Sequence, residues 1–216
     1  MLRRIFFLLI VCCAAMAFRP APGDPNKPTI LLIGDSTLEG LARRFHDYAV
    51  ENGYNLRSII WYGSTSKQWA RSKDLEYYIN ESQPVFIIVS LGTNEIGFND
   101  YGVREECVRQ MVHTIGDIPY VWLGPITWPR YKDRGMAAAI RRVVGDERYF
   151  DSTTVQLARQ RDGLHPTYEA AARWVDIVVQ WILKEVNIPG LDLRMPTRKT
   201  TLSNYVSLRP SYKGRH

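Results

Sequence analysis

The sequence has few of the residues that bind metals or form disulfides. It holds three cysteines and four histidines in 216 residues. Two of the cysteines lie in an apolar N-terminal run, so removal of that run leaves Cys107 without an intramolecular disulfide partner. Cys107 stands in the helical pattern REECVRQMV, which is typical of a small buried residue. The sequence shows no cluster of ligands with metal spacing, and we expect neither a metal nor a cofactor.

The sequence also lacks an apolar run of the length that spans a membrane. The N-terminal run, IFFLLIVCCAAMA, is shorter than the roughly 20 residues that a spanning helix needs. Arg3 and Arg4 precede it, and Ala15 and Ala17 offer small residues at its end, which is the pattern of a cleavable signal peptide. We expect residues 1–17 to be removed and the mature protein to be secreted or periplasmic. A lipid anchor on either cysteine of this run fits less well, because neither follows a small residue.

Excess positive charge is missing from the body of the chain, although the net charge is +6. The excess lies at the two ends. Two arginines precede the apolar run, and the segment 187–216 carries six lysines and arginines against one aspartate. A surface that binds nucleic acid needs basic residues on the folded body, so this distribution disfavours nucleic acid as a partner.

Strands and helices alternate through residues 29–188, after a proline-rich lead-in over 18–28. Apolar runs predict buried strands over 29–34, 55–63, 84–92 and 119–124, with a weaker one near 148–152. Helical spacing of apolar residues predicts helices over 38–53, 66–82, 103–115, 134–144 and 166–186. This alternation predicts an α/β fold, a flavodoxin-like three-layer α/β/α sandwich with a parallel sheet of about five strands.

The segment 189–216 loses this periodicity and is basic. We expect it to be an extension with little core of its own. It could be a solvated tail, which is the more common outcome, or a positively charged arm that touches an anionic polymer or a membrane.

Four loops carry polar residues suited to one reaction. Three of the loops follow predicted strands and one precedes the last helix; they are GDS at 34–36, YGSTS at 62–66, GTNE at 92–95 and DGLHP at 162–166. The carboxyl ends of parallel strands meet at one edge of an open sheet, so we expect these loops to come together.

The residue types in these loops match the parts of a serine hydrolase. A serine hydroxyl needs an adjacent base, and His165 could supply it for Ser36. Asp162 lies three residues before His165 and could orient its ring. The backbone N–H groups of Ser36 and Gly63 and the side-chain amide of Asn94 could bind an oxyanion. Each residue alone is equally typical of a cap or a turn, but their joint occurrence favours the catalytic interpretation.

The four blocks resemble those of the SGNH, or GDSL, hydrolase family over about residues 30–183. The serine, glycine, asparagine and histidine of the family's name correspond here to Ser36, Gly63, Asn94 and His165. The resemblance implies a three-layer α/β/α fold and an esterase that uses a Ser36–His165–Asp162 triad without a metal.

One position departs from the family pattern. Many members have aspartate after the block-three asparagine, whereas this chain has Glu95. The longer side chain could change how Asn94 is braced, but the amide donor itself is kept. Asp35 belongs to the family signature, and we assign it to holding the turn around Ser36.

The resemblance does not fix the substrate, because the family hydrolyses esters and thioesters of very different size. The signal peptide and a predicted aromatic rim favour an exported O-acetylesterase acting on a carbohydrate. The aromatic candidates for that rim are Trp61, Tyr62, Trp69 and Trp128, although aromatic side chains are also ordinary core residues and the helical position of Trp69 favours packing in the core. Trp128 and Arg130 follow the fourth predicted strand and are the candidate substrate-binding residues.

Three alternatives stay open on the sequence. A lysophospholipase or arylesterase would prefer longer acyl chains, and a glycan O-acyltransferase would use the same triad while excluding water. A non-catalytic binding module would retain only the scaffold. The sequence predicts no oligomeric state.

Overall fold

The structure is a computed structural model that describes residues 23–186 and 188–216. The predicted signal peptide over 1–17 and residues 18–22 of the lead-in lie outside the described residues.

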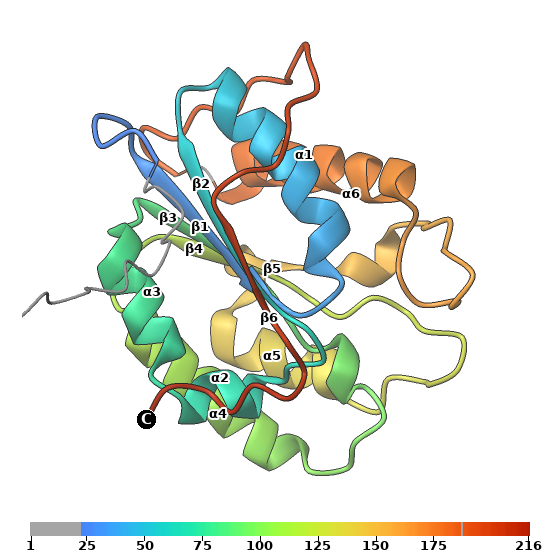
Figure 1. Ribbon diagram of the computed structural model, residues 1–216. Coiled ribbons are helices and arrows are strands. Elements are labelled where there is room, and N and C mark those ends of the chain that lie inside the picture. The colour runs from blue at the N-terminus through green and yellow to red at the C-terminus, as the bar shows by residue number, and fades with distance from the viewer. Residues whose placement is uncertain (1–22, 187) are drawn as a thin grey trace, which may run out of the picture.

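A six-stranded parallel sheet forms the middle layer (Figure 1). Its strands are β1 (Thr29–Gly34), β2 (Asn55–Trp61), β3 (Phe86–Ser90), β4 (Tyr120–Leu123), β5 (Tyr149–Phe150) and β6 (Tyr205–Leu208). Their spatial order is β5-β4-β3-β1-β2-β6, and each neighbouring pair is parallel. The five strands predicted from apolar runs are present, and the sixth comes from the C-terminal segment.

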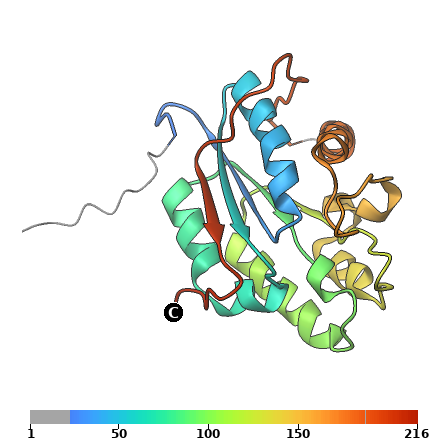
Figure 2. The same cartoon turned by 45° about the vertical axis from the view of Figure 1, so that its right-hand side comes forward.

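Helices cover both faces of the sheet, which confirms the predicted three-layer α/β/α fold (Figures 1 and 2). One face carries α1 (Leu38–Glu51) and α6 (Tyr168–Trp181). The other carries α2 (Ser66–Arg71), α3 (Asp74–Ser82), α4 (Tyr101–Ile115) and α5 (Met136–Val144). Three short 3-10 helices are η1 (Thr93–Glu95), η2 (Asp146–Arg148) and η3 (Ser152–Thr154), and η4 (Ile182–Val186) is a π-helix that follows α6.

The central strand β1 shows why the apolar runs are unbroken. Ile30 and Leu32 pack into the core beneath α1 and α6, whereas Leu31 and Ile33 pack into the core on the opposite face. Alternate side chains of a strand point to opposite faces, so a strand covered on both sides needs apolar residues throughout. Cys107 is likewise buried, within α4.

The predicted helix over 66–82 is wrong, because two helices occupy this range. α2 ends at Arg71, and Ser72 is extended with φ −103° and ψ 161° before α3 begins at Asp74. The Lys73 N–H donates at the break to the carbonyl of Arg215 at 2.9 Å. The C-terminal segment therefore supplies a hydrogen bond where the helix is interrupted.

The C-terminal segment also differs from the predicted extension. β6 pairs with β2 from Ser58↔Tyr205 to Trp61↔Leu208 and forms the edge of the sheet (Figure 2). Leu193, ahead of this strand, is buried. The sequence pattern gave no sign of β6 because its side chains are exposed or only half-buried and its pairing is made by the backbone.

Candidate active site

The loops that carry the predicted site residues follow the three central strands. β3, β1 and β2 are neighbours in that order and run in the same direction. Ser36 follows β1, Gly63 follows β2 and Asn94 follows β3, each by a few residues. The three residues therefore emerge at one edge of the sheet, as expected for an open parallel sheet.

A chain of hydrogen bonds joins Ser36, His165 and Asp162. Ser36 Oγ lies 2.9 Å from His165 Nε2, and His165 Nδ1 lies 2.6 Å from Asp162 Oδ2. The hydrogen bond from the His165 ring has the largest effect on the pKa of Asp162, and together with the hydrogen bond from the Leu164 N–H it lowers this pKa to about 2. Because the ionised carboxylate can only accept, Nδ1 carries the proton and Nε2 is free to accept from the serine hydroxyl. The arrangement places a serine beside a base.

The turn that carries His165 is tied to its own backbone. Oδ1 of Asp162 accepts from the N–H groups of Leu164 at 2.9 Å and His165 at 3.0 Å. Gly163 has φ +69°, in the left-handed region that favours glycine. The Asp162 carboxylate and Gly163 thus fix the conformation of the turn that positions the His165 ring.

Arg159 supports the same turn from outside, and sequence reasoning missed it. Its Nη1 donates to the carbonyl of Leu164 at 2.6 Å. Its Nη2 donates to the carbonyl of Thr127 and to Thr127 Oγ1, the latter at 3.1 Å. The guanidinium thereby joins the histidine loop to the loop after β4. No spacing in the sequence marks this role, because the partners are mostly backbone carbonyls.

The turn around Ser36 is fixed on both sides. A Cβ at Gly34 would lie 2.3 Å from the carbonyl oxygen of Ser90, so only glycine fits where β1 and β3 meet. Asp35 Oδ1 accepts from the Thr37 N–H at 2.9 Å and the Thr37 hydroxyl at 2.7 Å. This agrees with the role assigned to Asp35 from the sequence.

Asp35 itself is completely buried. Burial raises its pKa to about 6, although the hydrogen bonds from Thr37 lower it. Its Oδ2 has no hydrogen-bond partner among the described residues. A carboxyl group in this environment takes up a proton more readily than an ordinary aspartate does.

The three predicted oxyanion donors have hydrogens to spare within the described part of the chain. The N–H groups of Ser36 and Gly63 make no hydrogen bond there, and Gly63 is held at φ +69°. Asn94 Nδ2 donates to the carbonyl of Ser64 at 3.0 Å, which leaves its second hydrogen available. This bond also joins the third block to the second, so Asn94 is braced by the Gly63 loop.

Glu95 braces the neighbouring backbone from a fully buried position. Its carboxylate accepts from the N–H of Ser66 at 2.8 Å and from the Ser66 hydroxyl at 2.7 Å. Arg104 Nη1 donates to the same group at 3.2 Å. Burial raises the pKa of Glu95, while Ser66 and Arg104 oppose that shift. Glu95 thus reaches the first residue of α2 and a side chain of α4.

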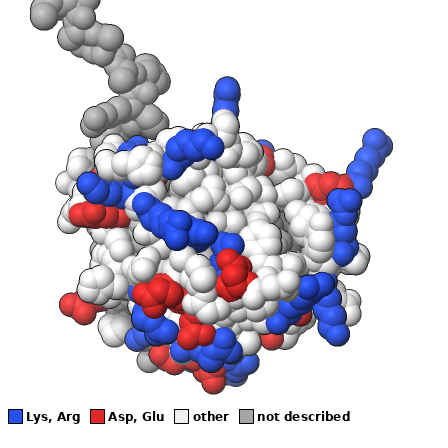
Figure 3. Space-filling model, turned by 90° about the horizontal axis from the view of Figure 1, so that it is seen from below, with Lys and Arg blue, Asp and Glu red and all other residues white. Residues whose placement is uncertain are grey.

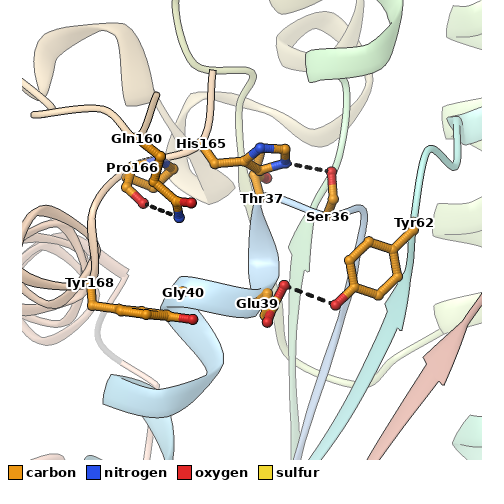
Figure 4. Close-up of a pocket in the computed structure, with 9 residues that line it drawn as sticks. All are labelled: Ser36, Thr37, Glu39, Gly40, Tyr62, Gln160, His165, Pro166 and Tyr168. Atoms are coloured by element: carbon orange, nitrogen blue, oxygen red, sulfur yellow. Dashed lines mark hydrogen bonds between the residues drawn. The ribbon is translucent and has the colours of Figure 1, made fainter. Parts of the chain in front are cut away.

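A cavity of about 240 Å³ lies beside the serine and the histidine (Figure 4). Its walls are Ser36, Thr37, Glu39, Gly40, Tyr62, Gln160, His165, Pro166 and Tyr168. Glu39 and Tyr62 join across it, with the tyrosine hydroxyl donating to Oε2 of the carboxylate at 2.8 Å. The sequence reasoning missed Glu39, Gln160 and Tyr168 as cavity residues, because each stands in a helix or loop pattern that explains it without a ligand.

Of the four aromatic residues predicted for the rim, Tyr62 lines the cavity and the three tryptophans do not, whereas Tyr168 lines it without having been predicted. Trp61 and Trp69 are buried in the core. Trp128 stacks edge-on against Tyr131 at 4.9 Å between ring centroids, and it is not part of the cavity wall. Arg130 is exposed and also lies outside that wall.

Figure 3 views the molecule from the end where the strands finish, with basic and acidic side chains interspersed across it.

In residues 23–186 and 188–216, no helix has the length and apolarity that a membrane crossing requires. Over the same ranges, no group of three or more His, Cys, Asp or Glu side chains could hold a metal ion.

Neither a comparison with protein-family models nor one with curated proteins finds a match for this sequence. Solved structures do match. A two-domain esterase (CEX) active on acetylated mannans is 16% identical, with a TM-score of 0.52 over 82% of this chain and 54% of that one. A putative GDSL-like lipase from Bacteroides ovatus is also 16% identical, with a TM-score of 0.57 over 76% of this chain and 55% of that one. The chain therefore spans about half the length of either protein.

A third match covers a whole domain. The C-terminal catalytic domain of Streptococcus pneumoniae peptidoglycan O-acetyltransferase A (OatA) is 14% identical, with a TM-score of 0.51 over 76% of this chain and 97% of that domain. At these identities the likeness is one of fold. The chain has the α/β fold of the SGNH, or GDSL, hydrolases.

Proposed function

We propose that this chain is an exported serine esterase of the SGNH type that removes O-acetyl groups from a carbohydrate. The observation that carries the proposal is the hydrogen-bonded chain from Ser36 through His165 to Asp162, at 2.9 Å and 2.6 Å, opening on a cavity. A serine, a base and an orienting carboxylate in this order are the parts of acyl transfer through an acyl-enzyme.

Acylation begins when Ser36 Oγ attacks the ester carbonyl carbon and its proton passes to His165 Nε2. The oxygen of the tetrahedral intermediate is stabilised by the N–H groups of Ser36 and Gly63 and by the free hydrogen of Asn94. The intermediate collapses as the bond to the alcohol oxygen breaks. The alcohol leaves with the proton from His165, and Asp162 stabilises the imidazolium between these transfers.

Deacylation repeats these steps with water. His165 Nε2 takes a proton from a water molecule, whose oxygen attacks the acyl carbon on Ser36. The bond to Ser36 Oγ then breaks, the serine regains its proton from His165, and acetate is released. The cycle consumes one water for each ester cleaved and needs no other reactant.

The size and lining of the cavity support a short acyl group on a polar alcohol. A space of about 240 Å³ is small for a ligand site, and carboxylate, amide and phenol groups stand among its walls. The fold neighbour CEX is an esterase active on acetylated mannans. The predicted signal peptide over 1–17 supports export.

Acetate release tests the proposal. The mature protein, residues 18–216, should release acetate from acetylated mannan and hydrolyse p-nitrophenyl acetate, with rates that fall as the acyl chain of the p-nitrophenyl ester lengthens. Ser36→Ala should abolish both activities. Acetate release that persists in Ser36→Ala would contradict the proposal, and rates that rise with chain length would favour the lysophospholipase or arylesterase alternative.

A second candidate is transfer of the acyl group to a glycan hydroxyl instead of water. It is favoured by the match to nearly the whole catalytic domain of a peptidoglycan O-acetyltransferase. Product analysis with a sugar acceptor present separates the two: an esterase releases acetate, whereas a transferase forms acetylated sugar.

A further inference from the structure

Glu39 is a carboxylate beside the nucleophile that no step of the proposed mechanism uses. It lies in the first turn of α1, and its N–H donates to the carbonyl of Ser36 at 3.3 Å. The two residues are therefore about one helical turn apart and share a wall of the same cavity (Figure 4). A fixed negative charge this close to the reacting serine must affect which esters can bind.

The Glu39 carboxylate is held in place, and only one of its oxygens is satisfied. Tyr62 donates its hydroxyl to Oε2 at 2.8 Å, and the Tyr62 N–H is bonded to the carbonyl of Leu208 on β6 at 3.0 Å. Oε1 has no hydrogen-bond partner among the described residues. The free oxygen can therefore accept a hydrogen bond from a ligand in the cavity.

The charge of Glu39 is not neutralised by an ion pair in the described part of the chain. Arg43 lies one turn further along α1, at the spacing where an ion pair could form, but its guanidinium stacks on the ring of Tyr168 at 4.5 Å. Arg43 belongs to the wall of a neighbouring cavity and not to that of the Ser36 cavity. The start of α1 favours a carboxylate here, because the N-terminal end of a helix carries partial positive charge.

Tyr168 gives the same cavity an apolar wall. Its side chain is about half exposed although Arg43 covers part of the ring. A carboxylate acceptor beside an aromatic surface suits a sugar, whose hydroxyls donate hydrogen bonds and whose C–H face packs on a ring. It does not suit an ester that carries its own negative charge near the scissile bond.

We propose that Glu39 is a specificity-determining residue, which accepts a hydrogen bond from a hydroxyl of the alcohol part of the ester and repels anionic esters. The inference rests on the proposed esterase function and narrows it to neutral, hydroxyl-rich acetyl esters. Two like charges about 6 Å apart in a partly screened site repel each other enough to change kcat/KM by one to two powers of ten.

The test compares kcat/KM of wild type and Glu39→Gln on three acetyl esters: p-nitrophenyl acetate, its anionic analogue 4-acetoxybenzoate, and an acetylated mannooligosaccharide. Glutamine removes the charge and keeps an acceptor for Tyr62. We expect the variant to gain about tenfold on 4-acetoxybenzoate and to lose about tenfold on the sugar, with less than a threefold change on p-nitrophenyl acetate. The gain on the anionic ester should shrink as salt is added, since salt screens charge.

Two further variants serve as controls. Glu39→Asp keeps the charge and should keep the discrimination against 4-acetoxybenzoate. Glu169→Gln removes an exposed charge at the start of α6, in the neighbouring cavity, and should leave all three values unchanged. Equal changes on all three esters in Glu39→Gln, or none, would overturn the inference while the esterase function stands. A wild-type protein that cleaves no ester would overturn both.

Discussion

The candidate site and the C-terminal segment differ in how far their key side chains are buried. The side chains of the site are partly open to solvent, with Asp162 47% and His165 29% exposed. The C-terminal segment 189–216 instead docks on carboxylates that lie inside the protein. The difference suggests that the site residues are positioned for chemistry, and that the segment holds the edge of the sheet together.

Asp74 is the main anchor of the segment. It is fully buried, and it pairs with the guanidinium of Arg215 and accepts from the Tyr212 hydroxyl and the Arg215 N–H, both at 2.9 Å. A second anchor is Asp47, whose Oδ1 accepts from the N–H and the hydroxyl of Thr200 at 2.6 Å and 2.8 Å. Both carboxylates are satisfied by a segment far away in the sequence.

The two regions touch at Tyr62. Its N–H is bonded to Leu208 of β6, while its hydroxyl is bonded to Glu39 in the cavity. Substitutions that affect catalysis without affecting stability, and the reverse, measure how far the two regions are independent.

The largest expected effect belongs to the site. His165→Ala removes the base and should lower kcat by about ten thousand-fold, while the free energy of unfolding changes by less than about 0.5 kcal/mol. Ester hydrolysis and urea unfolding, each monitored on the same preparation, check this. A loss of activity below tenfold would contradict the role of His165 as base.

Asp74→Ala should have the reverse effect. It leaves the partly buried Arg215 unpaired and removes the acceptor of Tyr212, and it should lower the free energy of unfolding by about 3 kcal/mol. We expect kcat at 20 °C to change less than threefold. Asp192→Ala is the matched control, because Asp192 lies in the same segment with its side chain 70% exposed, and it should cost less than about 0.5 kcal/mol. Equal stability of the two variants would show that the segment is not anchored at Asp74.

Asp35 sharpens the comparison because it is buried like Asp74 but has no ion-pair partner among the described residues. Its pKa is about 6 when folded and 3.8 in its ordinary state. Between these pH values the folded protein binds a proton that the unfolded chain has released, so stability is highest at low pH and falls as pH rises. This group should lower the free energy of unfolding by about 2 kcal/mol between pH 4 and pH 6.

Asp35→Asn should remove that slope. Urea unfolding of wild type and variant at pH 4, 5, 6 and 7 measures the difference in slope, which does not depend on how well asparagine packs. Parallel pH profiles for the two proteins would contradict the raised pKa.

The smallest effect expected is that of Tyr212→Phe. The ring keeps its edge-on contact with Trp61, at 5.1 Å between centroids. The hydroxyl that donates to Asp74 at 2.9 Å and accepts from Arg215 Nη1 at 3.2 Å is lost. The free energy of unfolding should fall by about 1 kcal/mol with no change in kcat. Thermal unfolding together with p-nitrophenyl acetate hydrolysis checks both statements. A loss of stability as large as that of Asp74→Ala would contradict the claim that Asp74 is the main anchor and the Tyr212 hydroxyl a minor one.

The same comparison explains what the sequence could predict. Ile30 to Ile33 form an unbroken apolar run because both faces of β1 are covered. Such a local pattern can be recognised from the sequence alone. Ser36, Gly63 and Asn94 could be grouped because parallel strands end at a common edge. The Asp162–His165 turn spans four residues, so its spacing alone suggested contact.

Contacts between distant residues could not be predicted in this way. Arg215 and Asp74 are 141 positions apart, and nothing in the surroundings of either indicates the other. The break at Ser72 lies beside a hydrogen bond from the Lys73 N–H to the carbonyl of Arg215, and β6 is held by backbone pairing to β2. In the sequence, Glu39 has the pattern of an ordinary acidic residue in the first turn of a helix. Its place in the site depends on its contact with Tyr62 across the cavity, which only the structure shows.

The most direct test of the central claim is to map where a fluorophosphonate attaches to a protein of residues 18–216. The account predicts one adduct, identified by mass spectrometry on the peptide that contains Ser36, with labelling strongly slowed in His165→Ala. No adduct, or an adduct on a different serine, would contradict the claim that Ser36 is the nucleophile.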